Sequence, residues 1–174
     1  MNLRRRAILR IVLGCLLLFL AMALTFIIKE VLSARNPEKA LPHMQVTVGD
    51  LLLADKHSTT YAYSWRFLTD AIDGRSGPDA LLDENLPAAM VLPSQPLLIE
   101  FSYAATSIKV SRADEGSPQF YEISPSSENR AAGNSASSLL YTPSQPGVYI
   151  YQVEASWWLR GSVEYYFRID VRSP

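Results

Sequence analysis

The chain has 174 residues, of which 48% are hydrophobic and 19% are charged, and its formal net charge is −1. This length accommodates one domain and an additional segment. The charge is unevenly placed: the first 29 residues carry five basic and no acidic side chains, whereas the rest carries eleven basic and seventeen acidic ones. An acidic body repels phosphate backbones, so the composition disfavours nucleic-acid binding.

An uncharged apolar stretch lies near the N-terminus. It runs for 18 residues, Ile11–Ile28, between Arg10 and Lys29. A helix of this length rises about 27 Å, which is close to the hydrocarbon thickness of a bilayer. Four arginines precede the stretch and little net charge follows it. The positive-inside rule therefore places the N-terminus in the cytoplasm and the body outside the cell membrane.

This orientation divides the chain into four parts. We predict a cytoplasmic basic tail (1–10), a single transmembrane helix in membrane lipid (11–28), a juxtamembrane tether (29–43) and an extracytoplasmic domain (44–174).

Two alternatives concern the leading segment. One is a signal peptide cleaved near Ala34, and the other is a bacterial lipoprotein signal with Cys15 as the lipid acceptor. Apolarity that continues to Ile28 argues against the first. Thirteen uncharged, mostly apolar residues follow Cys15 where a lipoprotein has a polar tether, which argues against the second.

From Met44 the pattern changes to short β-type runs separated by Pro, Gly, Ser and Asp clusters. One run places Tyr61, Tyr63 and Trp65 on one side, which assigns Trp65 to the core. The last run is the clearest, with apolar residues at every second position: Val163, Tyr165, Phe167, Ile169 and Val171. Such runs predict a mainly β chain, with an antiparallel immunoglobulin-like β-sandwich after the helix.

Three local features complete this prediction. Tyr149 or Tyr151, after the turn at Pro143–Gly147, is a candidate for the corner tyrosine found in such sandwiches. A short helix or turn is expected around 78–85, and a mobile loop is expected at 125–138, where the residues are small and polar.

The motifs of the body resemble those of a family of small, uncharacterised extracytoplasmic proteins of Bacillus-type bacteria, anchored directly in the membrane or by lipid. The matching motifs are VTVGD at 46–50, YSW at 63–65, GPDALL at 77–82, VLPSQPLLIEFS at 91–102, and PGVYIYQVEASW followed by YYFRIDV. The resemblance implies an immunoglobulin-like domain outside the cell. Family members commonly carry a cysteine before the tryptophan and another shortly after it, but here Ser64 holds the first position and no second cysteine exists. The resemblance therefore implies no disulfide and no catalytic residue.

Catalytic and metal-ligating patterns are weak. Nucleophilic catalysis usually needs a histidine base, but His43 lies in the predicted tether and His57 in a predicted turn. Metal binding by these histidines with Asp50 and Asp55 matches no known ligand spacing. A single cysteine excludes an internal disulfide and a Cys/His zinc site. We therefore predict no enzyme activity, no cofactor and no metal site.

Carboxylates cluster around two glycines between Asp70 and Glu84. The members are Asp70, Asp73, Asp79, Asp83 and Glu84. Oxygen-rich loops of this kind hold calcium outside cells, but the spacing matches no known calcium loop. Acidic turn residues also keep a surface soluble. A metal- or calcium-binding envelope protein, a carboxylate-based hydrolase and a structural subunit of a membrane complex are the alternative functions.

Two adjacent tryptophans, Trp157 and Trp158, end one of the last runs. Successive strand residues point to opposite faces, so we expect one of the two to be exposed. Together with Tyr121 and Tyr166, it is a candidate platform for a sugar ring, a peptide or a partner domain. The alternative is a tryptophan that only covers the end of a hairpin. On the platform hypothesis, replacing either tryptophan by alanine leaves folding intact and weakens partner binding.

The sequence thus predicts a non-enzymatic, membrane-anchored binding or interaction module of a bacterial cell envelope, with an envelope protein or glycan as its partner.

Overall fold

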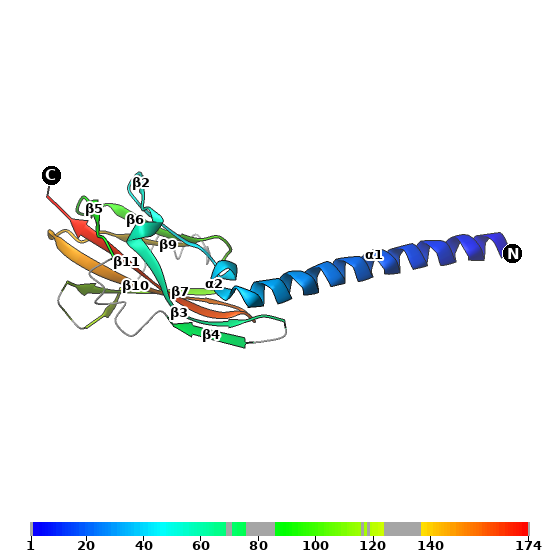
Figure 1. Ribbon diagram of the computed structural model, residues 1–174. Coiled ribbons are helices and arrows are strands. Elements are labelled where there is room, and N and C mark those ends of the chain that lie inside the picture. The colour runs from blue at the N-terminus through cyan, green and yellow to red at the C-terminus, as the bar shows by residue number, and fades with distance from the viewer. Residues whose placement is uncertain are drawn as a thin grey trace. The chain divides into compact units, whose positions relative to one another are not determined.

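The computed structural model describes residues 2–68, 71–75, 86–115, 117, 119–123 and 137–173. The chain separates into two compact units (Figure 1). One is the N-terminal helical unit, which comprises Met1–Ala40 with Phe67–Asp70, and the other is a β unit formed by the remaining residues.

The helical unit is dominated by α1 (Asn2–Arg35), which is followed by the short α2 (Pro37–Ala40). Within α1, Arg10–Arg35 is long and apolar enough to cross a membrane, and none of its most apolar window is buried. The helix does not end at Ile28, because the residues after it are mostly good helix formers. Much of the segment predicted as a tether is therefore helical, and only residues 41–43 separate α2 from the first strand.

The β unit contains two sheets. The four-stranded sheet has the order β2-β1-β6-β9, and the larger, seven-stranded sheet has the order β4-β3-β11-β10-β7-β8, with β5 also paired to β11. The smaller sheet is formed by β1 (Met44–Val48), β2 (Leu51–Leu52), β6 (Pro96–Phe101) and β9 (Ser137–Tyr141). The larger sheet is formed by β3 (Ser58–Arg66), β4 (Ala71–Arg75), β5 (Ala89–Val91), β7 (Ser107–Asp114), β8 (Tyr121–Ile123), β10 (Gly147–Trp157) and β11 (Gly161–Val171). A 3-10 helix, Asp55–His57, precedes β3.

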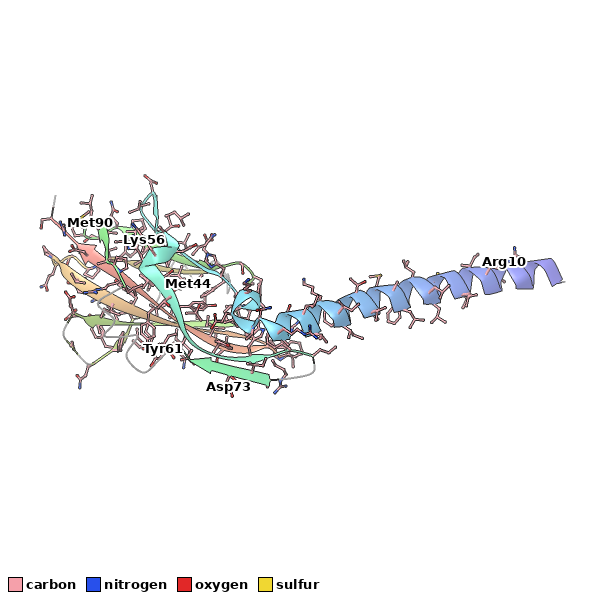
Figure 2. All side chains as sticks on the ribbon, in the orientation of Figure 1. Arg10, Met44, Lys56, Tyr61, Asp73 and Met90 are labelled. Atoms are coloured by element: carbon pink, nitrogen blue, oxygen red, sulfur yellow. The ribbon has the colours of Figure 1, made fainter. Side chains whose placement is uncertain are left out.

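The long hairpin β10–β11 is the centre of the larger sheet. β10 pairs with the whole length of β11 on one side. On the other side, β3 pairs antiparallel with residues 161–167 and β5 pairs parallel with residues 169–171. The two ends of β11 are therefore marked by different neighbours. Asp73 pairs with Ser64, which in turn pairs with Ser162 near the start of β11, whereas Met90 pairs with Asp170 near its end. Figure 2 shows Asp73 and Met90 at opposite ends of the β unit.

The core lies between the two sheets. All five alternating apolar residues of β11 are at most 3% exposed, which confirms the predicted buried face of this strand. Phe101 of the smaller sheet contacts two rings of the larger sheet, with centroids 5.3 Å from Trp157 and 5.5 Å from Tyr165. The prediction of a mainly β chain, with an antiparallel sandwich after an apolar helix, is confirmed.

The predicted alignment of Tyr61, Tyr63 and Trp65 on one face is wrong for Tyr61. The register of β3 against β11 shifts between Glu164 and Tyr165, so that β3 has one extra residue at this point. Such a bulge turns a side chain to the other face of the sheet. The Tyr61 ring packs edge-on against Tyr166, 5.1 Å away, on the outer face of the larger sheet. Trp65 stays on the inner face, where it contacts Trp157.

A corner tyrosine is present at Tyr149. Its hydroxyl donates a hydrogen bond of 3.0 Å to the backbone oxygen of Gln145, four residues earlier. Tyr151 is instead fully buried and stacks on Phe167, with ring centroids 4.7 Å apart.

The predicted loop at 125–138 is wrong for its last two residues, because Ser137 and Ser138 pair with Glu100 and Ile99 in the smaller sheet. Residues 125–136 of this loop and the turn expected at 78–85 lie outside the described residues.

Candidate functional site

The connection between β10 and β11 forms a tight turn, Trp158–Arg160, which together with its flanking residues Trp157 and Gly161 is called the tip below. The turn is closed by a hydrogen bond of 3.1 Å from the Arg160 amide to the Trp157 carbonyl. Leu159 takes the left-handed conformation, with φ of 62°. Gly161 has φ of 124°, and a Cβ atom there would lie 1.9 Å from the backbone oxygen of Ser64. The sequence therefore needs glycine at the start of β11 for this turn to form.

The two tryptophans of the tip point to opposite sides. Trp157 is 6% exposed, whereas Trp158 is 78% and Leu159 is 65% exposed. The Trp157 ring packs 5.4 Å from Trp65, and its Nε1 donates a hydrogen bond of 3.2 Å to the backbone oxygen of Tyr103. Trp157 thus holds the tip to the core, and Trp158 is presented to the surroundings.

Hydrogen bonds to two neighbouring segments fix the backbone of the tip. The Trp158 amide donates to Oγ1 of Thr106 over 2.9 Å, and the Thr106 amide donates to the Ser156 carbonyl over 2.7 Å. On the other side, the Arg66 amide donates to the Arg160 carbonyl over 2.6 Å. The guanidinium of Arg160 donates back to the Arg66 carbonyl over 3.3 Å. The exposed apolar side chains are therefore carried by a backbone that is held before any ligand binds.

An open groove of about 540 Å³ lies beside the tip. Its lining includes Trp65, Arg66, Thr106, Trp158, Leu159 and Arg160. None of the described residues that line it is acidic. The groove thus combines apolar side chains with two guanidinium groups, although the body as a whole is acidic. This combination is suited to a ligand that is partly apolar and partly anionic.

The structure does not bring the four predicted platform residues together. Tyr166 is only 2% exposed, because the rings of Tyr61 and Phe120 pack on it at 5.1 and 6.0 Å. Its hydroxyl donates to Glu164 Oε1 over 2.6 Å. Tyr166 therefore stabilises the outer face of the sheet and offers no exposed ring. Buried Trp157 is likewise part of the core.

Tyr121 is exposed, at 43%, but it lies far from the tip. It pairs with Arg112, and Arg112 pairs with Tyr151, six positions along β10 from Trp157. Strand geometry makes this separation about 20 Å. The Tyr121 hydroxyl also accepts a hydrogen bond of 2.7 Å from Nε of Arg112, so this tyrosine belongs to a different part of the sheet.

Of the predicted platform, only Trp158 is at the tip surface. Leu159, Arg66 and Arg160 were not predicted. The run Trp-Trp-Leu-Arg-Gly between two alternating strands is the signal that indicates an exposed tip at 158–160, because the turn leaves the strand alternation there. Arg66 is brought to the tip by the pairing of β3 with β11, which no local pattern indicates.

The histidines and carboxylates lie elsewhere. His43 Nε2 lies 3.3 Å from Asp55 Oδ1, and His57 Nδ1 lies 2.7 Å from the Pro87 carbonyl. Among the described residues, no group of three or more His, Cys, Asp and Glu side chains is placed to hold a metal. Asp73 pairs with Ser64 in the sheet, and the other members of the acidic cluster lie outside the described residues. Cys15 is exposed on α1.

Comparison of the chain with protein-family models, with curated proteins and with solved structures finds no match, so a functional proposal depends on the residues and their geometry.

Proposed function

We propose that this chain is a membrane-anchored, non-enzymatic binding module of a bacterial cell envelope, and that it binds through the tip of the β10–β11 hairpin. The α1 helix holds the chain in the membrane, and the β unit stands on the extracytoplasmic side.

The anchoring part of the proposal is supported by α1. Within Arg10–Arg35, the stretch Ile11–Ile28 has no charged residue on any face, and a helix of that kind is stable in lipid rather than in water. Arginines at its N-terminal end favour a cytoplasmic tail by the positive-inside rule.

The single observation that supports binding is the exposure of Trp158 and Leu159 on a fixed backbone. Large apolar side chains cost free energy when water surrounds them, and binding sites are enriched in tryptophan and arginine. A backbone already held by Thr106 and Arg66 loses little conformational entropy on binding, so more of the contact energy is retained.

Topology can be tested in a background that has no cysteine, because Cys15 is the only one in the chain. In Cys15→Ala, a new cysteine is placed either in the β unit (Met90→Cys) or in the tail (Asn2→Cys), and intact cells are treated with a membrane-impermeant maleimide. We expect Met90→Cys to be labelled in intact cells and Asn2→Cys only after permeabilisation. The reverse pattern, or release of the protein from membranes by alkaline carbonate, would contradict the anchoring proposal.

Binding through the tip can be tested in the same cells. A photoreactive amino acid replaces Leu159, or replaces Met90 as the matched control, since both side chains are exposed and apolar but lie at opposite ends of β11. We expect crosslinked products that depend on the Leu159 position and are lost in Trp158→Ala. Equal products from both positions would show that the tip has no special role.

A further inference from the structure

We propose that the ligand of the tip is the lipid surface of the membrane that holds α1. Trp158 and Leu159 enter the boundary between headgroups and acyl chains, and Arg66 and Arg160 face the lipid phosphates. This inference rests on the proposed anchoring and names the partner of the same site.

The chain joins the β unit at the end that carries the tip. The Pro42 carbonyl, just after the start of this unit, accepts a hydrogen bond of 2.5 Å from the Tyr165 hydroxyl. The next residue, His43, accepts a hydrogen bond at its carbonyl from the Ser102 amide and donates one from its own amide to Ser102 Oγ. Phe101, the neighbour of Ser102, packs on Trp157. The junction and the tip are thus linked through a short series of direct contacts within one unit.

The connection to the membrane is short. Only residues 29–40 lie between the apolar stretch and Leu41. They include the end of α1 and all of α2. Twelve residues reach about 18 Å as helix and about 40 Å when fully extended. The covalent chain therefore keeps the junction end of the β unit within about 40 Å of the bilayer surface.

The opposite end of the β unit is farther from the junction than the tip is. β11 extends from Gly161 at the tip to Val171, which is about 33 Å in strand geometry. Met90, which is 64% exposed, pairs beside Asp170 near that far end (Figure 2). Both ends carry exposed apolar side chains, but the covalent chain joins the β unit nearer to the tip, so the tip has the shorter path to the membrane.

The chemistry of the tip matches this location. Tryptophan is enriched at membrane interfaces, where its ring contacts the acyl boundary and its N–H remains near water. Leucine adds apolar area that lipid removes from water. Guanidinium groups form paired hydrogen bonds with phosphate oxygens, and the exposed Arg66 lines the groove beside the tip.

Because the chain is anchored, even a weak contact between the tip and lipid is sufficient to hold the tip at the membrane. Two apolar side chains and two arginines would bind a membrane only weakly if the β unit were free in solution. When the chain is anchored, contact of the tip with lipid becomes an intramolecular event at a high effective concentration. The tip then restrains the β unit at the membrane surface.

The experiment uses the full chain in vesicles of phosphatidylcholine and phosphatidylglycerol. In Cys15→Ala, an environment-sensitive fluorophore is attached to Leu159→Cys or to the matched control Met90→Cys, and lipids carrying a spin label at the headgroup or in the acyl chain are added as quenchers. We expect blue-shifted emission and strong quenching at position 159, and neither at position 90. We also expect Trp158→Ser to reduce the quenching at position 159 at least twofold. Arg66→Gln should reduce it more in vesicles that contain phosphatidylglycerol than in phosphatidylcholine alone, because only phosphatidylglycerol carries a net negative charge.

Three results would overturn the inference: no lipid quenching at position 159, equal quenching at both positions, or crosslinking of position 159 in cells to a protein or glycan in place of phospholipid. The last result leaves the proposed binding function intact and changes only its partner. Failure of the anchoring proposal is recognised separately, because Met90→Cys would then remain unlabelled in intact cells.

Discussion

Trp157 and Trp158 are neighbours in the chain, yet their surroundings are opposite. Trp157 packs among the rings of Trp65, Phe101 and Tyr103, whereas Trp158 is 78% exposed. The two residues stand where β10 ends and the turn begins, so one side chain completes the core and the other leaves it. Their contributions to stability and to binding are therefore expected to be separate.

Alanine substitution tests this separation. We expect Trp157→Ala to lower the free energy of unfolding by about 3–5 kcal/mol, because it leaves a large cavity and an unpaired Tyr103 carbonyl. Trp158→Ala should change it by less than about 0.5 kcal/mol. Denaturant unfolding of the detergent-solubilised chain measures both values. This prediction replaces the expectation that either substitution leaves folding intact, and similar losses from the two variants would contradict it.

Glycine substitutions test the geometry of the tip. We expect Gly161→Ala to cost about 3 kcal/mol or more, because both its positive φ and the Ser64 carbonyl oppose a Cβ atom. Gly49→Ala is the matched comparison, since its φ is also positive, at 58°, but the nearest atoms belong to the flexible side chain of Gln95. It should cost only about 1–2 kcal/mol. Thermal unfolding ranks the two variants, and a Gly49→Ala variant less stable than Gly161→Ala would show that the turn is not under this constraint.

The corner tyrosine has a defined hydrogen bond to lose. Tyr149→Phe removes the donor to the Gln145 carbonyl but keeps the ring, so we expect a loss of about 1 kcal/mol in the free energy of unfolding. Tyr141→Phe on β9 provides the control. The Tyr141 side chain is half exposed, so loss of its hydroxyl should change the free energy of unfolding little. Chemical denaturation measures the difference between the variants. Equal stability of the two would mean that the corner bond contributes nothing.

Stability should fall at alkaline pH because of Tyr151. Burial raises the pKa of Tyr151 from 10.0 to about 12, and the nearby Arg112 guanidinium offsets part of this rise. The unfolded chain then loses this proton near pH 10 while the folded chain keeps it to about pH 12. The unfolded state binds fewer protons in this window, so rising pH favours unfolding. The stability contribution is complete below pH 10 and is lost as pH rises to about 12, a change on the order of 2 kcal/mol.

The Tyr151→Phe variant isolates this effect from other alkaline titrations. We expect its free energy of unfolding to fall less steeply than that of the parent chain between pH 10 and 12. Burial also raises the pKa of Tyr165, so some alkaline dependence should remain in the variant. Parallel curves for parent and variant would show that Tyr151 titrates normally in the folded chain.

Features that depend on local periodicity can be predicted from the amino-acid sequence. Alternation of period two assigned Val163 to Val171 to a buried face, because strand residues point alternately to the two sides of a sheet. The same rule required Trp157 and Trp158 to differ in exposure. An unbroken apolar stretch indicated a helix suited to lipid, since no face of it is polar.

Contacts between residues of distant strands are visible only in the folded chain. A bulge in β3 moved Tyr61 to the outer face, and there it covers Tyr166 together with Phe120. Pairing between β3 and β11 brought Arg66 to the tip, while the position of β8 kept Tyr121 away from it. Local patterns report which face a side chain takes, but contacts between distant strands depend on register and sheet order, which no single segment encodes.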